Sequence, residues 1–394
     1  MAPRKCSKKN SSPDQQNDAQ YDNEDVDTFY DMLVDNMEKA QSKNARLRLD
    51  GLQKLTTLLA SKPAPNFISA NQETLVYIAG RPCNKSEKEA EQHVLLLGLI
   101  ALQAGAQVAH LMQEPMEQLR SILMDSAKPG SLRTACANSL AVISRFCVEE
   151  SEDVEENLKA LQYAWGGIRP GTREDPSLAT SSLAAYCIVI LDGNSRSIRK
   201  MQQEVQPEIF NLLSSAHLEV RLAAAEALGH LYEFMLEARP GFRFDNHEDV
   251  IEKLLELKGD FSKKTSKSDR RLQRRAIREI VDFMDGESDA PEELVKIGHQ
   301  TLRLDTFGSR AFYSILCDIL GGGISRHLMF NEVLREEFEL GDVCGKGMKM
   351  SARDKRIEIF HHHCNDKYRD QGRAKDRNIR MGECYGFQDE GCEV

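Results

Sequence analysis

The feature that most constrains this chain is a weak internal repeat of Ala- and Leu-rich segments, each patterned to form one apolar helix face. Five segments carry apolar or small residues at offsets 0, 8 and 11, which fall on one side of a helix. Their first positions lie 43, 42, 46 and 42 residues apart, at Leu47, Ala90, Leu132, Leu178 and Val220. A sixth copy begins at Leu272, after a step of 52 residues. An interval of about 40–47 residues is typical of HEAT and armadillo repeats.

The composition favours helices packed on helices. The chain of 394 residues is 41% hydrophobic but only 6% aromatic, with one Trp, so its core must be mainly aliphatic. Prolines and glycines separate the copies, and no segment alternates with period two for long, so we expect no β-sheet domain. These features predict an all-α, armadillo- or HEAT-like helical solenoid. An irregular all-helical globule is the alternative.

Changes in composition divide the chain into four parts. The N-terminal residues are polar and lack periodicity, as disordered arms do. The apolar residues Phe29, Leu33 and Met37 then recur at helical spacing and place the first helix near Asp25. We therefore expect a disordered arm, an armadillo/HEAT-like repeat domain, a C-terminal helical domain and a basic tail, over residues 1–24, 25–286, 287–342 and 343–394.

The net charge of −10, from 62 acidic and 52 basic residues, argues on average against a polyanionic partner. The distribution of charge along the chain changes that conclusion. The segment from Lys258 to Arg278 contains nine basic residues and two Asp, so its local net charge is +7. The arginines recur at three and four residues, so most of them would share one helix face, spaced to meet successive phosphates. The predicted nucleic-acid-binding residues are Lys263, Lys264, Lys267, Arg270, Arg271, Arg274, Arg275 and Arg278.

A second basic segment lies near the end of the chain. Residues 367–380 hold six Lys or Arg against Asp370 and Asp376 and have no apolar stripe to bury. Such a segment either stays solvated or orders on a polyanion, and the arginine-rich helix has a similar alternative, a solvated face paired with nearby glutamates. The predicted nucleic-acid-binding residues of the tail are Lys367, Arg369, Arg373, Lys375, Arg377 and Arg380.

Signatures of membrane and secreted proteins are missing from the sequence. The N-terminus has no apolar stretch behind its basic residues, and the longest apolar run, 94–102, is less than half of the roughly 20 residues that span a bilayer. The ten cysteines include no Cys-x-x-Cys pair, and most sit in apolar stretches, as reduced core thiols do. We expect an intracellular protein without a membrane partner.

The sequence also lacks a convincing catalytic or metal-binding motif. The segment 341–347 is one residue short of a phosphate-binding loop and lacks the Ser or Thr that should follow Lys346. The adjacent side chains of residues 361–364 (HHHC) would point in different directions on a helix, which disfavours a zinc site. We expect no catalytic residue, no metal, no cofactor and no small-molecule substrate.

Three stretches resemble the interferon-related developmental regulator family. They are EVRLAAAEALGHLYEF at 219–234, SKKTSKSDRRLQRRAIREIVDF at 262–283 and, most specifically, the block 302–341 with its Leu-Gly-x-Gly, Asn-Glu-x-Leu-Arg and Phe-Glu-Leu-Gly elements. The resemblance implies an armadillo-like region, a family-specific C-terminal domain and no enzymatic activity. It also implies a transcriptional co-regulator, or a factor on translationally inactive ribosomes whose basic C-terminal helix enters the mRNA path.

Two hypotheses of function follow. In the first, the protein is a non-enzymatic regulator of gene expression whose solenoid docks proteins and whose basic segments contact ribosomal RNA and repress translation. In the second, it is a nuclear transcriptional co-regulator that acts by protein binding only. The solenoid groove would then recognise transcription factors or co-repressor proteins, and the basic segments would serve as import signals. The expected localisation is cytoplasm and nucleus.

Overall fold

The computed structural model describes residues 28–80, 86–148, 150–166, 175–259, 267–298 and 300–342. The predicted arm (1–24) and basic tail (343–394) lie outside the described residues. The chain divides into two compact units, Met1–Leu58 and Leu59–Val394. Both are helical, as predicted, and the larger unit contains most of the repeats.

The smaller unit contains a helix over residues 28–40 and most of α2 (Ala45–Ser61). Phe29, Leu33 and Met37 are all buried, which confirms the helix face predicted for this segment. The predicted first repeat position, Leu47, is wrong as a core residue, because its side chain is 43% exposed. The predicted position eight residues later, Leu55, is buried together with Leu52, whereas Leu47 lies in the first turn of the helix.

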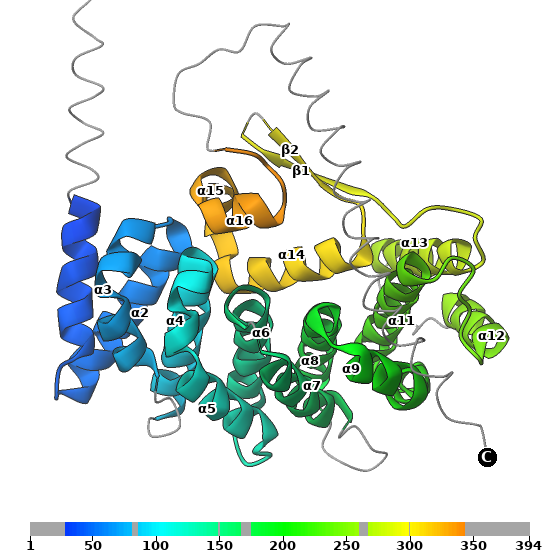
Figure 1. Ribbon diagram of the computed structural model, residues 1–394, viewed down its shortest axis with the longest axis horizontal. Coiled ribbons are helices and arrows are strands. Elements are labelled where there is room, and N and C mark those ends of the chain that lie inside the picture. Colours follow the sequence, from blue (N-terminus) through cyan, green and yellow to red (C-terminus); the bar gives the residue numbers. More distant parts are fainter. Residues whose placement is uncertain are drawn as a thin grey trace, which may run out of the picture. The chain divides into compact units, whose positions relative to one another are not determined.

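In the larger unit, consecutive helices pair and the pairs stack (Figure 1). The first four repeat positions of this unit, Ala90, Leu132, Leu178 and Val220, are buried, which confirms the predicted repeat. Each lies on the second helix of a pair, and these helices contact one another in sequence order. The pairs are α3 (Pro65–Ala79) and α4 (Glu87–Ala104), α5 (Gln113–Met124) and α6 (Gly130–Cys147), α7 (Ser151–Gly166) and α8 (Pro176–Val189), α10 (Gln206–Leu212) and α11 (Leu218–Ala238), and α12 (His247–Gly259) and α13 (Lys267–Met284).

Short helical segments join the pairs, and side-chain caps set several helix starts. The joining segments are η2 (Gly105–Leu111), η3 (Ile190–Asp192), α9 (Ser195–Lys200) and η4 (Met201–Val205). The Asp175 side chain accepts a hydrogen bond from the backbone N–H of Leu178, and Pro176 occupies the first turn of α8. Asn194 caps α9 by accepting from the backbone N–H groups of Arg196 and Ser197.

Within the described residues, one helical stretch, Glu87–Leu111, is long and apolar enough to cross a membrane. It consists of α4 and η2, and 67% of its most apolar window is buried inside the protein. Helix α4 contacts both α3 and α6, so its apolar residues are explained by its place in the core of the protein.

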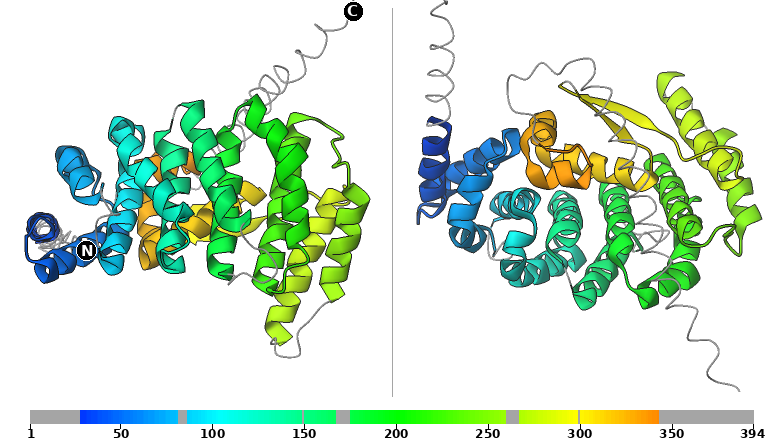
Figure 2. Two further views of the ribbon diagram at one scale, coloured as in Figure 1. Left: turned by 90° about the horizontal axis from the view of Figure 1, so that it is seen from below. Right: turned by 45° about the horizontal axis from the view of Figure 1, so that its top comes forward.

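A third layer covers one face of the stack, which we call the inner face (Figures 1 and 2). It consists of α14 (Phe307–Leu320), α15 (Ile324–Phe330) and α16 (Glu332–Glu337), with η5 (Gly321–Gly323) between α14 and α15. Helix α14 runs across the row of repeat helices and contacts α4, α8 and α11, and α16 contacts α4. The C-terminal helices therefore occupy the inner face from α4 to α11.

Buried polar contacts fix this third layer to the repeats. The Asn331 side chain donates to the carbonyl of Leu102 at 3.0 Å, and His327 Nε2 lies 3.0 Å from the carbonyl of Leu59. Glu233 of α11 accepts a hydrogen bond from the backbone N–H of Phe307 at 2.8 Å. These bonds satisfy polar groups that would otherwise be buried unpaired, so the layer is part of the core of this unit.

A β-hairpin between α13 and α14 is the main departure from the helical prediction for residues 287–342. Strand β1 (Glu293–Ile297) pairs antiparallel with β2 (Gln300–Leu304), with Val295 opposite Leu302. Gly298 follows β1 with a φ of +56°, the positive value that tight hairpin turns require. Only one face is buried, through Ile297, Leu302 and Leu304, so each strand shows too short an alternation to be recognised in the sequence.

Candidate nucleic-acid interface on α13

Helix α13 is strongly amphipathic, and its apolar side fixes how it sits in the protein. It contacts α11 and α12, and Ile277, Ile280 and Met284 are buried. Near its end, the Phe283 ring packs 5.9 Å from Tyr232 of α11 and 5.5 Å from Phe307 of α14. Because three neighbouring elements hold this side, the opposite side must face solvent.

Four arginines share that solvent-facing side: Arg271, Arg274, Arg275 and Arg278. All four side chains are exposed, and their spacing of i, i+3, i+4 and i+7 places them in one stripe about 100° wide. We call these four residues the arginine face. At about 1.5 Å rise per residue, it runs for about 10 Å along the helix, a length that covers about three successive phosphates of a nucleic-acid strand.

The arginine face is positively charged, and one of its members forms an ion pair with a glutamate on the same helix. Arg275 Nε lies 2.6 Å from Glu279 Oε1, and this hydrogen bond raises the pKa of Arg275 above its usual value. Glutamate pairing, the alternative expected from the sequence, is therefore present at Arg275. Guanidinium groups remain protonated at neutral pH and present planar donors that match phosphate oxygens.

The other predicted site residues are less completely described. Lys267 and Arg270 lie in the first turn of α13, where the backbone is described but their side chains are not. Lys263 and Lys264 lie outside the described residues, as do Lys367, Arg369, Arg373, Lys375, Arg377 and Arg380. The structure therefore brings together the central part of the predicted patch, and the contribution of the tail stays a prediction.

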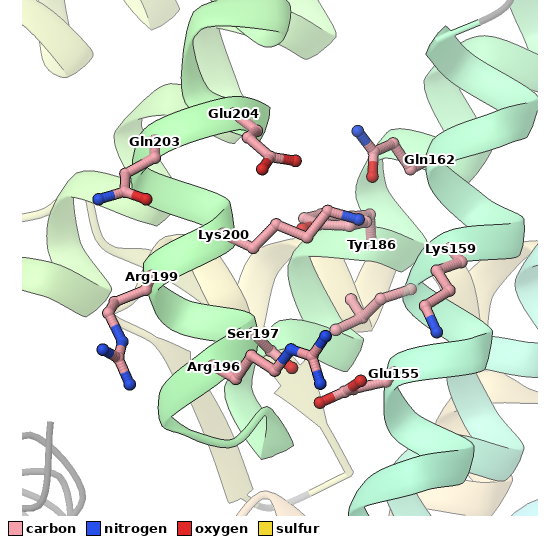
Figure 3. Close-up of a pocket in the computed structure, with 11 residues that line it drawn as sticks. Glu155, Lys159, Gln162, Tyr186, Arg196, Ser197, Arg199, Lys200, Gln203 and Glu204 are labelled. Atoms are coloured by element: carbon pink, nitrogen blue, oxygen red, sulfur yellow. The ribbon is translucent and has the colours of Figure 1, made fainter.

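A second cationic site was missed by sequence reasoning. A cleft of about 480 Å³ lies between α7 on one side and α9 with η4 on the other (Figure 3), and its lining includes the buried residues Leu158 and Tyr186. We call it the α7–α9 cleft. Its charged and amide lining residues are Glu155, Lys159, Gln162, Arg196, Arg199, Lys200, Gln203 and Glu204. The only sequence signal was the four-residue spacing of Arg196, Lys200 and Glu204, which is common on solvated helices.

Potential metal ligands are scattered through the described residues. These residues contain no group of three or more His, Cys, Asp or Glu able to hold a metal ion. Cys136, Cys147 and Cys187 are buried and form no disulfide with another described residue, as predicted for core thiols. Burial raises the pKa of Cys147 to about 12 and also raises that of Cys187, so neither thiol provides a thiolate nucleophile near neutral pH.

Comparison with protein families gives two matches. The model described as interferon-related developmental regulator matches residues 4–285, and the model described as interferon-related protein conserved region matches residues 331–381. The first match ends one residue after α13, and the second covers α16 and the predicted basic tail as far as residue 381.

Two relatives carry the name of the first matching family, and solved helical-repeat proteins also align with the chain. Interferon-related developmental regulator 2 of Mus musculus is 28% identical over 342 residues, covering 84% of this chain and 76% of that protein. Interferon-related developmental regulator 1 of Homo sapiens is 25% identical over 311 residues, covering 76% and 68%. Among solved structures, a designed armadillo repeat protein aligns at 16% identity with a TM-score of 0.43, covering 63% of this chain and 99% of that chain. A mutant of Kap121p aligns at 11% identity with a TM-score of 0.46, covering 80% and 32%.

Proposed function

This chain belongs to the interferon-related developmental regulator family, and from that premise we propose that it is a non-enzymatic regulator of gene expression that binds ribosomal RNA and represses translation. In this proposal the arginine face of α13 and the basic tail contact RNA phosphates. Phosphate contacts supply affinity without sequence readout, so selectivity for the ribosome comes from the shape of the RNA and from protein contacts.

The arginine face is the observation that carries the proposal. Its four guanidinium groups are exposed in one stripe, while the opposite side of α13 is anchored in the core. A rigid helix that presents cations at fixed spacing can meet several phosphates with little loss of conformational entropy. The net charge of −10 does not argue against RNA binding by α13, because the acidic residues are concentrated in other segments of the chain.

The absence of enzymatic activity is part of the same proposal. It is supported by the buried thiols and by the helical-repeat fold, which presents surfaces for binding. We also propose that the protein works in both cytoplasm and nucleus. A protein partner would need a surface other than the inner face between α4 and α11, because α14–α16 occupy that face.

The test compares ribosome binding of the full-length protein with that of a triple variant, Arg271→Gln, Arg274→Gln and Arg278→Gln. If each arginine meets a phosphate, the variant binds at least about tenfold more weakly, and the slope of log affinity against log salt falls by about 2 to 3. The matched control, Arg46→Gln, Lys88→Gln and Arg326→Gln, changes the net charge equally at exposed positions elsewhere. Wild-type affinity and salt slope in the arginine-face variant would refute the role of α13.

The tail is tested separately by ending the chain at Arg353. We expect this truncated protein to lose co-sedimentation with ribosomes, and unchanged binding would exclude the tail as a contact. Fractionation of cells with and without RNase then distinguishes the two functional hypotheses. Association with large particles that RNase abolishes supports the ribosomal one, whereas an RNase-resistant nuclear complex favours co-regulation through proteins.

A further inference from the structure

The α7–α9 cleft is held open at a defined width by hydrogen bonds at both ends. At one end, Asn194 Nδ2 donates to Glu155 Oε1 at 3.0 Å, while the Asn194 oxygen caps α9. At the other end, Gln162 Nε2 donates to Glu208 Oε2 of α10 at 2.9 Å. Between α9 and α10 the chain forms a π-helical turn, η4, a feature often found at functional sites. The cleft is therefore a built feature of the fold.

Three cations extend into this cleft without an ionic partner among the described residues. Figure 3 shows the side chains of Arg196 and Lys200 reaching toward α7, which carries Glu155 and Lys159, while Arg199 points away. None of these three forms a salt bridge within 4.0 Å with a carboxylate in the part of the chain that the structure describes. The lining has four cationic and two acidic side chains, so its net charge is positive and an anionic ligand would be stabilised there.

The rest of the lining favours a peptide over a nucleic acid. Glu155 and Glu204 stand among the cations and would repel a continuous chain of phosphates, but each can accept hydrogen bonds from peptide N–H groups. The buried side chains of Leu158 and Tyr186 give an apolar base for a hydrophobic side chain. From Glu155 to Gln162 the cleft runs for about 10 Å along α7, the length of about three extended residues.

We propose that the α7–α9 cleft binds a short, extended acidic segment of a partner protein. Carboxylates of that segment pair with Lys159, Arg196 and Lys200, and an apolar residue between them rests on Leu158 and Tyr186. This surface is distinct from the arginine face of α13, so the inference does not depend on RNA binding. One chain can hold a protein segment at the cleft and RNA at α13.

Fluorescence anisotropy with the full-length protein tests the proposal. The probe is a fluorescein-labelled peptide, Glu-Leu-Glu-Asp-Leu-Glu, and its control carries Gln and Asn in place of Glu and Asp. We expect the acidic peptide to bind and the amide peptide to bind at least tenfold more weakly. The double variant Lys159→Glu with Lys200→Glu should lose at least tenfold in affinity for the acidic peptide, and the arginine-face triple variant should bind it as the wild type does.

The charge-reversed double variant, Lys159→Glu with Lys200→Glu, also distinguishes a loss of binding from a loss of folding. Lys159 is exposed and Lys200 is half-buried on the surface, so the double variant should keep the wild-type melting temperature. It should also bind the peptide Lys-Leu-Lys-Lys-Leu-Lys more tightly than the wild type does. Equal binding of the acidic and amide peptides would overturn the proposal. So would a double variant that still binds the acidic peptide but loses a labelled oligouridine, because the cleft would then be an RNA site.

Discussion

Arg335 ties together the C-terminal end of the described chain. Its buried guanidinium donates to the carbonyls of Leu328, Met329, Leu340, Gly341 and Asp342 at 2.7–3.3 Å, and to the side chain of Gln300 at 3.1 Å. One side chain therefore donates hydrogen bonds to backbone carbonyls at the ends of α15 and α16, and it also links these helices to β2 through Gln300. Few residues could replace it, because only arginine presents five donors in a fixed plane.

We therefore predict that Arg335→Lys is strongly destabilising although it conserves charge. A single ammonium cannot reach all of these acceptors, and several buried carbonyls would remain unpaired at about 1–3 kcal/mol each. We expect a loss of about 2–4 kcal/mol in the free energy of unfolding, measured by urea denaturation. Arg326→Lys, at an exposed position of α15, is the matched control and should be neutral. An equally small effect at Arg335 would contradict the role assigned to it.

His327 should make stability depend on pH. Burial lowers the pKa of His327 to about 4, although its hydrogen bond to the carbonyl of Leu59 opposes this shift. The unfolded chain takes up the proton near pH 6.5 and the folded chain does not, so this contribution is present above pH 6.5 and is lost as pH falls toward 4. Between pH 7 and pH 5 the loss should be about 2 kcal/mol.

The variant His327→Gln tests this assignment. Its amide can still donate to Leu59 but does not titrate, so its unfolding free energy should vary less between pH 7 and pH 5 than that of the wild type. His247, whose pKa is also lowered by burial, remains in both proteins and cancels in the comparison. Identical pH profiles would show that another group controls the acid sensitivity.

At the level of elements, the third layer approaches the repeats too closely for ordinary side chains at one point. A Cβ on Gly323 of η5 would lie 1.8 Å from the carbonyl oxygen of Ala60, whereas the neighbouring Gly322 has no atom within 4 Å of such a position. We predict that Gly323→Ala lowers the free energy of unfolding by about 1–3 kcal/mol, because backbone must shift to admit the methyl group. Gly322→Ala is the control, and thermal melts that do not distinguish the two would contradict this packing.

The elements that the sequence predicted are those with a long apolar period. Segments such as 90–101 and 220–231 repeat their pattern over three turns of helix, and their predicted positions are buried. The hairpin was missed because each strand has only five residues. The packing of the third layer across the inner face was also missed, because contacts such as Asn331 with Leu102 join residues 229 positions apart and leave no local pattern.

The two candidate sites also differ in whether a local sequence pattern could predict them. The arginine face could be predicted because its residues lie within a single helix and their spacing alone places them on one side. The α7–α9 cleft could not, because Lys159 and Lys200 come from different helices and meet only after α7, α8 and α9 have packed. Sequence periodicity reports on one element at a time, so sites shared between elements escape it.

For the whole molecule, the third layer should make the repeats unfold together. In a simple solenoid each repeat contacts only its neighbours, and a local defect stays local. Here α14 contacts α4, α8 and α11 together. We predict that Gly323→Ala lowers hydrogen-exchange protection in α4 and α8 as much as in α14, measured by mass spectrometry. Loss of protection confined to α14–α16 would show that the layer unfolds separately.

The same layer has a consequence for how the protein is made. Leu102 is synthesised 229 residues before Asn331, the residue that covers its carbonyl. Protein synthesis proceeds at about 5–20 residues per second, so this interval lasts about 10–45 s. During that time the inner face of the nascent repeats is exposed to water and to other chains. The larger unit cannot complete its fold until almost all of its described residues have left the ribosome. The yield of folded protein should therefore depend on chaperones that bind unfolded chains. This dependence should be stronger than for a solenoid whose repeats fold one after another.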